Sequence, residues 1–208
     1  MAFDIEKIEQ IFKERKPGVV GQYRYFSVLF PLVEQDGVLH VLFEVRAHDM
    51  KTQPGEVCFP GGMLEGEETP SQCALRETCE EIGICEDDIR LIARLDSVVN
   101  YSGFTIYSYL GVIDARALDR LKLNEGEVDE VFLVPLEWFV ENAPKVHDVE
   151  IKPDTADFPY EDVGVDKDYP WRCGRMDVPV YTWNEHYIWG LTARMMRNFV
   201  RVITGDIR

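Results

Sequence analysis

The sequence has few basic residues relative to acidic ones, and this shortage excludes several classes of partner. Lys and Arg total 22 against 38 Asp and Glu in 208 residues, so the formal net charge is −16. A chain this acidic repels phosphate backbones and anionic lipids, which argues against nucleic-acid partners and against docking on a membrane surface. It also requires that any phosphorylated ligand be met by a local cation.

Long apolar runs are missing as well. The longest, such as residues 28–33, fall far short of the roughly 20 residues that cross a bilayer, and the N-terminus has no apolar run of the signal-peptide type. We therefore expect a cytoplasmic protein with no membrane partner. With 46% hydrophobic and 29% charged residues, the composition is that of an ordinary globular protein, and the length fits one domain over residues 1–208.

Cysteine and histidine are also scarce. The four histidines show no ligand spacing, and the cysteines are five in number with no CxxC pair: Cys58, Cys73, Cys79, Cys85 and Cys173. This usage favours reduced thiols over a disulfide framework or a zinc site. We therefore expect all five cysteines to be free.

Apolar spacing and turn residues predict a mixture of helices and strands. We expect helices over 4–15, 70–82 and about 185–204, and strands over 26–33, 38–45, 91–99, 104–113 and 131–134. The helix over 70–82 has the best-marked ends. Thr69 is its N-cap, Pro70 occupies the first position, Gln72 completes a capping box, and Gly83 supplies the left-handed residue after the last turn.

Residues 144–179 differ from the rest of the chain in composition. They hold five of the eleven prolines and many aspartates. We expect a long, decorated loop that packs on the body of the domain through four aromatic side chains, namely Phe158, Tyr160, Tyr169 and Trp171. Because no internal repeat and no linker divides the chain, this segment is expected to belong to a single domain.

A group of carboxylates on the 70–82 helix is the strongest chemical signal. At about 100° per residue, Glu77, Glu80 and Glu81 share one face. Such carboxylates repel one another unless a cation lies between them, and hard oxygen ligands select Mg²⁺ or Mn²⁺. The alternative is a solvated acidic face. Against it, Glu77 and Glu81 lack a basic residue four positions on, and the preceding turn over 59–62 can aim a carbonyl at the same metal.

Residues 62–84 resemble the signature of the Nudix hydrolase family, G-x5-E-x7-R-E-U-x-E-E-x-G-U, where U is aliphatic. All seven fixed positions match: Gly62, Glu68, Arg76, Glu77, Glu80, Glu81 and Gly83. The one departure is Thr78 at an aliphatic position. Its methyl group can face the core, and its hydroxyl can bond to the carbonyl of Ala74.

The resemblance implies an α/β fold in which a mixed sheet lies between helices, an α/β/α sandwich. It also implies a hydrolase of nucleoside diphosphate derivatives that depends on a divalent metal. Glu77 and Glu81 would be metal ligands, Glu80 a further ligand or a catalytic base, and the Gly62 carbonyl another ligand.

Three more residues are candidates for a role in the site. The resemblance makes Glu68 and Arg76 a structural ion pair that holds the loop to the helix. Glu127 is a candidate general base or extra metal ligand, because it lies on the loop before a strand that runs toward the same sheet. The neighbouring acidic residues of that loop leave the choice of Glu127 open.

A longer stretch is similar to the coenzyme A diphosphatase subgroup, whose signature L-L-T-x-R-[SA]-x3-R-x3-G-x3-[FPYVM]-P-G-G precedes the box. The chain keeps this spacing from Leu42 to Gly62 and departs from it at Phe43, Glu44 and Lys51. The resemblance and the local charge make Arg46 and Lys51 phosphate-binding candidates, although Lys51 lacks the bidentate geometry of arginine. The alternative, that Arg46 ends a strand and Lys51 is a solvated loop residue, stays open.

The subgroup implies hydrolysis of coenzyme A or its thioesters to 3′,5′-ADP and 4′-phosphopantetheine, or the acyl form, with Mg²⁺ or Mn²⁺ as cofactor. Two alternatives remain. One is a different small-molecule substrate, such as ADP-ribose or a dinucleoside polyphosphate. The other is a non-catalytic Nudix-fold module that binds a nucleotide and regulates. The sequence also leaves open whether the chain forms a homodimer.

Overall fold

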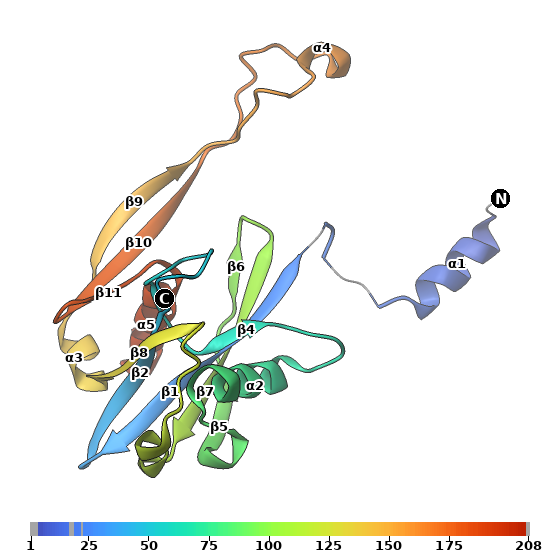
Figure 1. Cartoon of the computed structure of the whole chain (residues 1–208). Helices are drawn as coiled ribbons and strands as arrows, with labels where there is room; N and C mark the ends of the chain where they lie inside the picture. The colour runs from blue at the N-terminus through green and yellow to red at the C-terminus, as the bar shows by residue number, and fades with distance from the viewer. Residues whose placement is uncertain (1–3, 17–18, 22, 207–208) are drawn as a thin grey trace.

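A mixed β-sheet is the centre of the computed structural model, which describes residues 4–16, 19–21 and 23–206 (Figure 1). Its strands are β1 (Arg24–Gln35), β2 (Val38–Arg46), β3 (Val57–Cys58), β4 (Gly61–Met63), β5 (Ile89–Arg94), β6 (Val98–Asn100), β7 (Phe104–Ile113) and β8 (Val128–Pro135). The order is β3-β2-β1-β7-β5, with β4 beside β1, β6 beside β7 and β8 beside β2. β1 and β7 run parallel, whereas β1 and β2 form an antiparallel hairpin.

Helices cover both faces of this sheet. On one face, α2 (Pro70–Ile82) packs with η1 (Glu86–Asp88) and η2 (Ala115–Arg120) over one set of alternate strand residues, which includes Leu29 and Leu42. On the other face, α3 (Leu136–Glu141) and α5 (Gly190–Ile203) pack over the opposite set, which includes Phe30 and Phe43. The alternation of side chains along β1 and β2 thus fills two cores, and the predicted α/β/α arrangement is confirmed.

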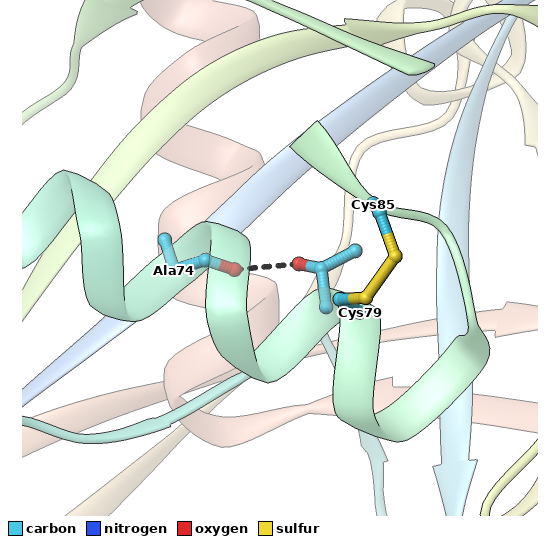
Figure 2. The surroundings of a disulfide bond; sticks show 4 residues. Ala74, Cys79 and Cys85 are labelled. Atoms are coloured by element: carbon cyan, nitrogen blue, oxygen red, sulfur yellow. Dashed lines mark hydrogen bonds between the residues drawn. A yellow bond between two sulfur atoms is a disulfide. The ribbon is translucent and has the colours of Figure 1, made fainter. Parts of the chain in front are cut away.

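The predicted ends of α2 are confirmed. Thr69 Oγ1 accepts the backbone N–H of Gln72 at 3.3 Å, and Gln72 Oε1 accepts the backbone N–H of Thr69 at 2.8 Å. Gly83 ends the helix with φ at 75°. The hydroxyl of Thr78 donates to the carbonyl of Ala74 at 2.7 Å, as expected (Figure 2). Local signals therefore fix the helix that carries the carboxylates.

The prediction of a loop over residues 144–179 is wrong at both of its ends. β9 (Lys145–Ile151) and β10 (Gly174–Trp183) pair as a long antiparallel hairpin, with α4 (Tyr160–Val163) near its tip. Figure 1 shows this tip extending away from the main sheet. The four aromatic residues stack on one another: Phe158 on Tyr160 and Trp171, and Tyr169 on Trp171. They form a small cluster of their own at the tip instead of packing on the body.

The C-terminal helix begins later than predicted. Residues 186–189 form β11 (His186–Trp189), which pairs with β10 to make a second, three-stranded sheet with β9. Gly190, with φ at 62°, turns the chain from this strand into α5. Ile188 is buried on the strand and not on the helix, whereas Met195 and Phe199 face the core from the helix.

The expectation that all five cysteines are free is also wrong. Cys79, in the last turn of α2, forms a disulfide with Cys85 (Figure 2). The left-handed Gly83 lies between them and reverses the chain, which brings their Cα atoms to 4.5 Å. Cys58, Cys73 and Cys173 remain free.

The N-terminal segment adds a helix that makes little contact with the body. Asp4 caps the start of α1 (Ile5–Glu14), and none of the described side chains of this helix is buried. Within the described residues, every helix is too short or too polar to span a lipid bilayer.

Candidate functional site

Two glycines on β4 bring backbone directly against α2. β4 pairs with β1, so that Gly61 lies opposite Val28 and Gly62 opposite Ser27. Gly61 has φ at 154°, and a Cβ there would lie 2.3 Å from the Ser27 carbonyl oxygen. A Cβ on Gly62 would lie 2.3 Å from Glu77 Cδ. Glycine is therefore required at Gly61, and Gly62 leaves room for the Glu77 carboxylate to lie on the backbone.

The three predicted carboxylates of α2 lie at different depths. Glu81 is 4% exposed, and its Oε2 accepts the backbone N–H of Gly61 at 2.8 Å. Glu77 is partly buried, with Oε1 2.8 Å from Arg76 Nη2. The Glu80 side chain is 55% exposed, and its Oε2 lies 3.0 Å from Arg76 Nη1. The helix therefore turns Glu81 inward and leaves Glu80 at the rim.

Arg76 also joins the loop before α2 to the helix. Its Nη2 lies 2.9 Å from Glu68 Oε1, and its Nε lies 3.1 Å from Glu68 Oε2, which makes a bidentate pair. The hydrogen bonds from Arg76 lower the pKa of Glu68 to about 2. The structure thus brings Glu68 and Arg76 together in the arrangement expected of a structural ion pair.

Glu44, in the middle of β2, is a fourth carboxylate, and sequence reasoning gave it no role. It is fully buried. Its Oε1 accepts a hydrogen bond from Cys58 Sγ at 3.2 Å, while its Oε2 has no hydrogen-bond partner among the described residues. Alternation along the strand places Glu44 on the same side as Leu42, which packs in the core under α2. The sequence contains one signal that points to Glu44, which is an ionisable residue in the middle of an apolar strand. Such residues are rarely fully buried unless they are paired.

Glu127 lies on the loop before β8, between the ends of β2 and α2. Its carbonyl accepts the backbone N–H of Ala47 at 2.8 Å, and the backbone N–H of Asn124 donates to the carbonyl of Glu81 at 2.8 Å. The side chain of Asn124 donates to Glu127 Oε2 at 3.0 Å. This loop therefore holds Glu127 beside the C-terminal end of α2.

These carboxylates raise one another's pKa values. Burial is the largest cause of the raised pKa of both Glu44 and Glu81, and the charge of Glu44 adds to the increase at Glu81. Burial also raises the pKa of Glu77 against the lowering effect of Arg76, and the charges of Glu80 and Glu127 add to the increase. The charge of Glu127 acts on Glu44 as well. Too little positive charge lies among these groups to balance them.

The two predicted phosphate-binding cations lie in different environments. Arg46 ends β2, and its Nε is buried without a hydrogen-bond partner in the described part of the chain. Its charge lowers the pKa values of Glu44 and Glu81. Lys51 is exposed in the turn after β2. Of the two, Arg46 belongs to the carboxylate site.

The donor set fits a hard divalent cation. Carboxylate oxygens from α2, β2 and the loop before β8 are the ligands that Mg²⁺ and Mn²⁺ prefer, and Glu44 Oε2 is a buried oxygen without a donor. As the side chains lie, residues 4–16, 19–21 and 23–206 contain no group of three or more His, Cys, Asp or Glu already arranged to hold a metal ion. Arg76 holds Glu77, the Gly61 N–H holds Glu81, and the Gly62 carbonyl lies 3.6 Å from Cys73 Sγ. Ligation would therefore exchange these contacts for bonds to the cation.

Comparison with known proteins identifies relatives. The model of the NUDIX domain matches residues 24–154. Nudix hydrolase 3 of Caenorhabditis elegans is 31% identical over 185 residues, which cover 87% of this chain and 74% of the relative. Peroxisomal coenzyme A diphosphatase NUDT7 of Mus musculus is 37% identical over 132 residues, which cover 61% of this chain and 55% of the relative.

Two further matches extend the comparison. Peroxisomal coenzyme A diphosphatase ndx-8 of C. elegans is 35% identical over 116 residues, covering 53% of this chain and 49% of that protein. The match thus spans about half the length of each of the two coenzyme A diphosphatases. Among solved structures, a C. elegans Ap4A hydrolase binary complex is 18% identical with a TM-score of 0.47, covering 56% of this chain and 83% of that one. Similarity at that level carries no information on the substrate.

Proposed function

Since this chain belongs to the NUDIX family of hydrolases, we propose that it cleaves the diphosphate of coenzyme A or of a coenzyme A thioester. The products are 3′,5′-ADP and 4′-phosphopantetheine or its acyl form. The observation that carries the proposal is the buried Arg46 Nε, which lacks an acceptor among the described residues and lies two residues along β2 from Glu44. A phosphate bound at the carboxylates would supply that acceptor. The motif from Leu42 to Gly62 and the two related coenzyme A diphosphatases support the choice of substrate.

We assign the metal to the face of α2. Glu77, Glu80 and Glu81, together with the Gly62 carbonyl, are the groups that would hold Mg²⁺ or Mn²⁺. When bound, the ion supplies positive charge to the diphosphate oxygens and lowers the pKa of a water molecule. It also balances the repulsion that raises the pKa values of Glu77 and Glu81. A chain with a net charge of −16 can in this way accept an anionic substrate.

The proton of the attacking water requires a base, and we assign this role to Glu127. Asn124 Nδ2 holds Glu127 Oε2 at 3.0 Å and so orients the carboxylate. Glu127 takes the proton while the water oxygen bonds to one phosphorus, and the bond from that phosphorus to the bridging oxygen breaks. The leaving phosphate keeps the electron pair. Glu80 is the second candidate, but it lies at the exposed rim in an ion pair with Arg76.

The other partners follow from the charge and the substrate. A small molecule is the expected ligand, and nucleic acid is disfavoured by the net charge of −16. A cytoplasmic location stays a prediction, and whether the chain forms a homodimer stays open.

A substrate panel tests the proposed function. The full chain with Mg²⁺ is incubated separately with coenzyme A, acetyl-coenzyme A, ADP-ribose and a dinucleoside tetraphosphate, and products are identified by liquid chromatography and mass spectrometry. We expect 3′,5′-ADP and 4′-phosphopantetheine from coenzyme A, with the highest kcat/KM in the panel for coenzyme A or its thioester. Cleavage of ADP-ribose or the dinucleotide without release of phosphopantetheine would overturn the proposal. Tight nucleotide binding with no cleavage of any substrate would instead indicate a regulatory module.

A further inference from the structure

We propose that Glu44 is an additional ligand for the divalent cation, supplied by the sheet from beneath the carboxylates of α2. This inference rests on the proposed function, because it concerns the same site. It goes beyond the family signature, which places all of its carboxylates in the box over residues 62–84. At the position of Glu44 the similar coenzyme A diphosphatase motif has threonine, so the motif does not include this carboxylate.

The environment of Glu44 leaves one carboxylate oxygen available. The side chain is 0% exposed, so water does not solvate it. Oε1 accepts a hydrogen bond from the thiol of Cys58 at 3.2 Å, which is a weak donor. Oε2 has no donor among the described residues. Buried polar atoms in folded proteins nearly always have a partner, so an unpaired carboxylate oxygen indicates a ligand that arrives from outside the chain.

Arg46 does not donate a hydrogen bond to the free oxygen of Glu44. It lies two residues along β2, and alternation places it on the same side of the strand as Glu44. Its Nε is nevertheless also buried without a hydrogen-bond partner in the described part of the chain. A fully buried carboxylate and a partly buried guanidinium therefore lie on the same side of β2, each with a buried atom that has no hydrogen-bond partner among the described residues. A cation at Glu44 together with a phosphate at Arg46 would satisfy both.

The backbone connects Glu44 to the carboxylates of α2. Glu44 lies opposite Cys58 in the pairing of β2 with β3. Three residues after Cys58, the N–H of Gly61 donates to Glu81 Oε2 at 2.8 Å. Glu44 and Glu81 thus flank the short segment over 58–61. Glu44 would therefore attract a cation held by Glu81. This additional carboxylate would strengthen the binding of the cation.

Manganese binding without substrate tests this inference on the full chain. Free Mn²⁺ is measured by electron paramagnetic resonance during titration of the wild type, Glu44→Gln, Glu44→Thr and the control Glu34→Gln. Glu34 is an exposed carboxylate on the neighbouring β1, so its variant makes the same charge change outside the site. We expect both Glu44 variants to bind Mn²⁺ at least about tenfold more weakly, or to lose one bound ion per chain. The control should match the wild type.

Folding is checked in the same samples by circular dichroism and by the melting temperature without metal. We expect the Glu44 variants to melt no lower than the wild type, because each removes a buried charge that lacks a partner. Unchanged Mn²⁺ affinity and stoichiometry in folded Glu44→Gln and Glu44→Thr would overturn the inference. Failure of both variants to fold would overturn it too, because Glu44 would then be needed by the metal-free structure.

The substrate panel separates this inference from the proposed function. If the wild type binds Mn²⁺ through Glu44 but releases no phosphopantetheine, the assignment of substrate fails and the role of Glu44 stands. If the wild type cleaves coenzyme A and the Glu44 variants bind Mn²⁺ as the wild type does, the assignment of substrate stands and the role of Glu44 fails.

Discussion

The backbone N–H of Gly61 donates to Glu81 Oε2 at 2.8 Å, which joins the start of β4 to the last turn of α2. This bond compensates part of the cost of burying Glu81, because it lowers the pKa that burial and Glu44 raise. It also fixes one oxygen of the carboxylate and leaves the other for a ligand. The glycine turn and the helix therefore form one unit, in which each part positions the other.

We expect Glu81→Gln to abolish turnover and leave the fold intact. The amide oxygen of glutamine can still accept the Gly61 N–H, but it is a weaker ligand for a hard cation than a carboxylate oxygen. The expected loss in kcat is at least about 100-fold at saturating Mg²⁺. Coenzyme A turnover and the circular dichroism spectrum measure the two effects. Glu137→Gln, at an exposed position of α3, is the control, and activity retained in Glu81→Gln would contradict the assignment of the α2 face.

Gly62→Ala should displace Glu77. The new Cβ would lie 2.3 Å from Glu77 Cδ, so the carboxylate must move off the backbone. Gly62 does not have a positive φ, so alanine fits the backbone there. We expect about tenfold weaker Mn²⁺ binding, with unfolding free energy within about 2 kcal/mol of the wild type. Gly174→Ala is the matched control, because its Cβ would meet Ile151 only at 3.8 Å. Equal Mn²⁺ affinity in the two variants would show that the position of Glu77 does not matter for the cation.

Arg46 and Lys51 should differ in their effect on substrate binding. Arg46 Nε is buried and without an acceptor, whereas Lys51 is exposed in a turn. Arg46→Ala should raise KM for coenzyme A by at least about tenfold, the size expected for a charge-assisted hydrogen bond. Lys51→Ala should change it by less than about threefold, because an exposed pair contributes little. Steady-state kinetics of the two variants, side by side, measure this, and equal effects would remove the distinction drawn from burial.

The helix α2 could be predicted from the sequence because its signals are local. Thr69, Pro70, Gln72 and Gly83 fix its two ends, and its 3.6-residue period fixes which carboxylates share a face. The ion pair of Glu68 with Arg76 comes from the same short segment. Each of these features depends on residues within about one or two turns of one another, so a single sequence contains the information.

The features that were missed depend on distant neighbours. The β9 strand is exposed along nearly all its length, so it lacks the alternating apolar pattern that predicts a strand. Glu44 is buried next to the carboxylates of α2 only because α2 packs over β2 and because β2 pairs with β3. The pairing of Cys79 with Cys85 depends on the turn that Gly83 makes, which cysteine counting does not consider. The β9 strand, the buried carboxylate and the disulfide are therefore determined by tertiary structure and not by local sequence preference.

Glu68 provides a prediction on pH. Its pKa is lowered to about 2 by Arg76, below the unfolded value of about 4.3. A group lowered in this way contributes stability above the unfolded pKa and loses it as the pH falls toward the folded pKa. Glu68→Gln should therefore unfold about 1–2 kcal/mol more easily than the wild type at pH 7, and this deficit should shrink between about pH 4.3 and pH 2. Urea denaturation at pH 7, 4 and 3 measures it. A deficit that stays constant with pH would assign the effect to packing instead of the ion pair.

The disulfide between Cys79 and Cys85 should be detectable in thiol counts and in stability. In denaturant without reductant, titration with Ellman's reagent should find three thiols, from Cys58, Cys73 and Cys173, and five after reduction. Five thiols in unreduced protein would contradict the bond. The loop that the disulfide closes is short, with a sequence separation of 6, so the chain-entropy contribution is only about 2 kcal/mol.

Cys85→Ser should therefore lower the unfolding free energy by about that amount, whereas the exposed Cys173→Ser should leave it unchanged. Cys79 directly precedes Glu80 and Glu81 on α2. Release of the bond thus loosens the turn that carries two of the proposed ligands, and Mn²⁺ affinity should fall together with stability in Cys85→Ser but not in Cys173→Ser. A loss of stability with unchanged affinity would show that Arg76 and the Gly61 N–H hold the carboxylates without help from the disulfide.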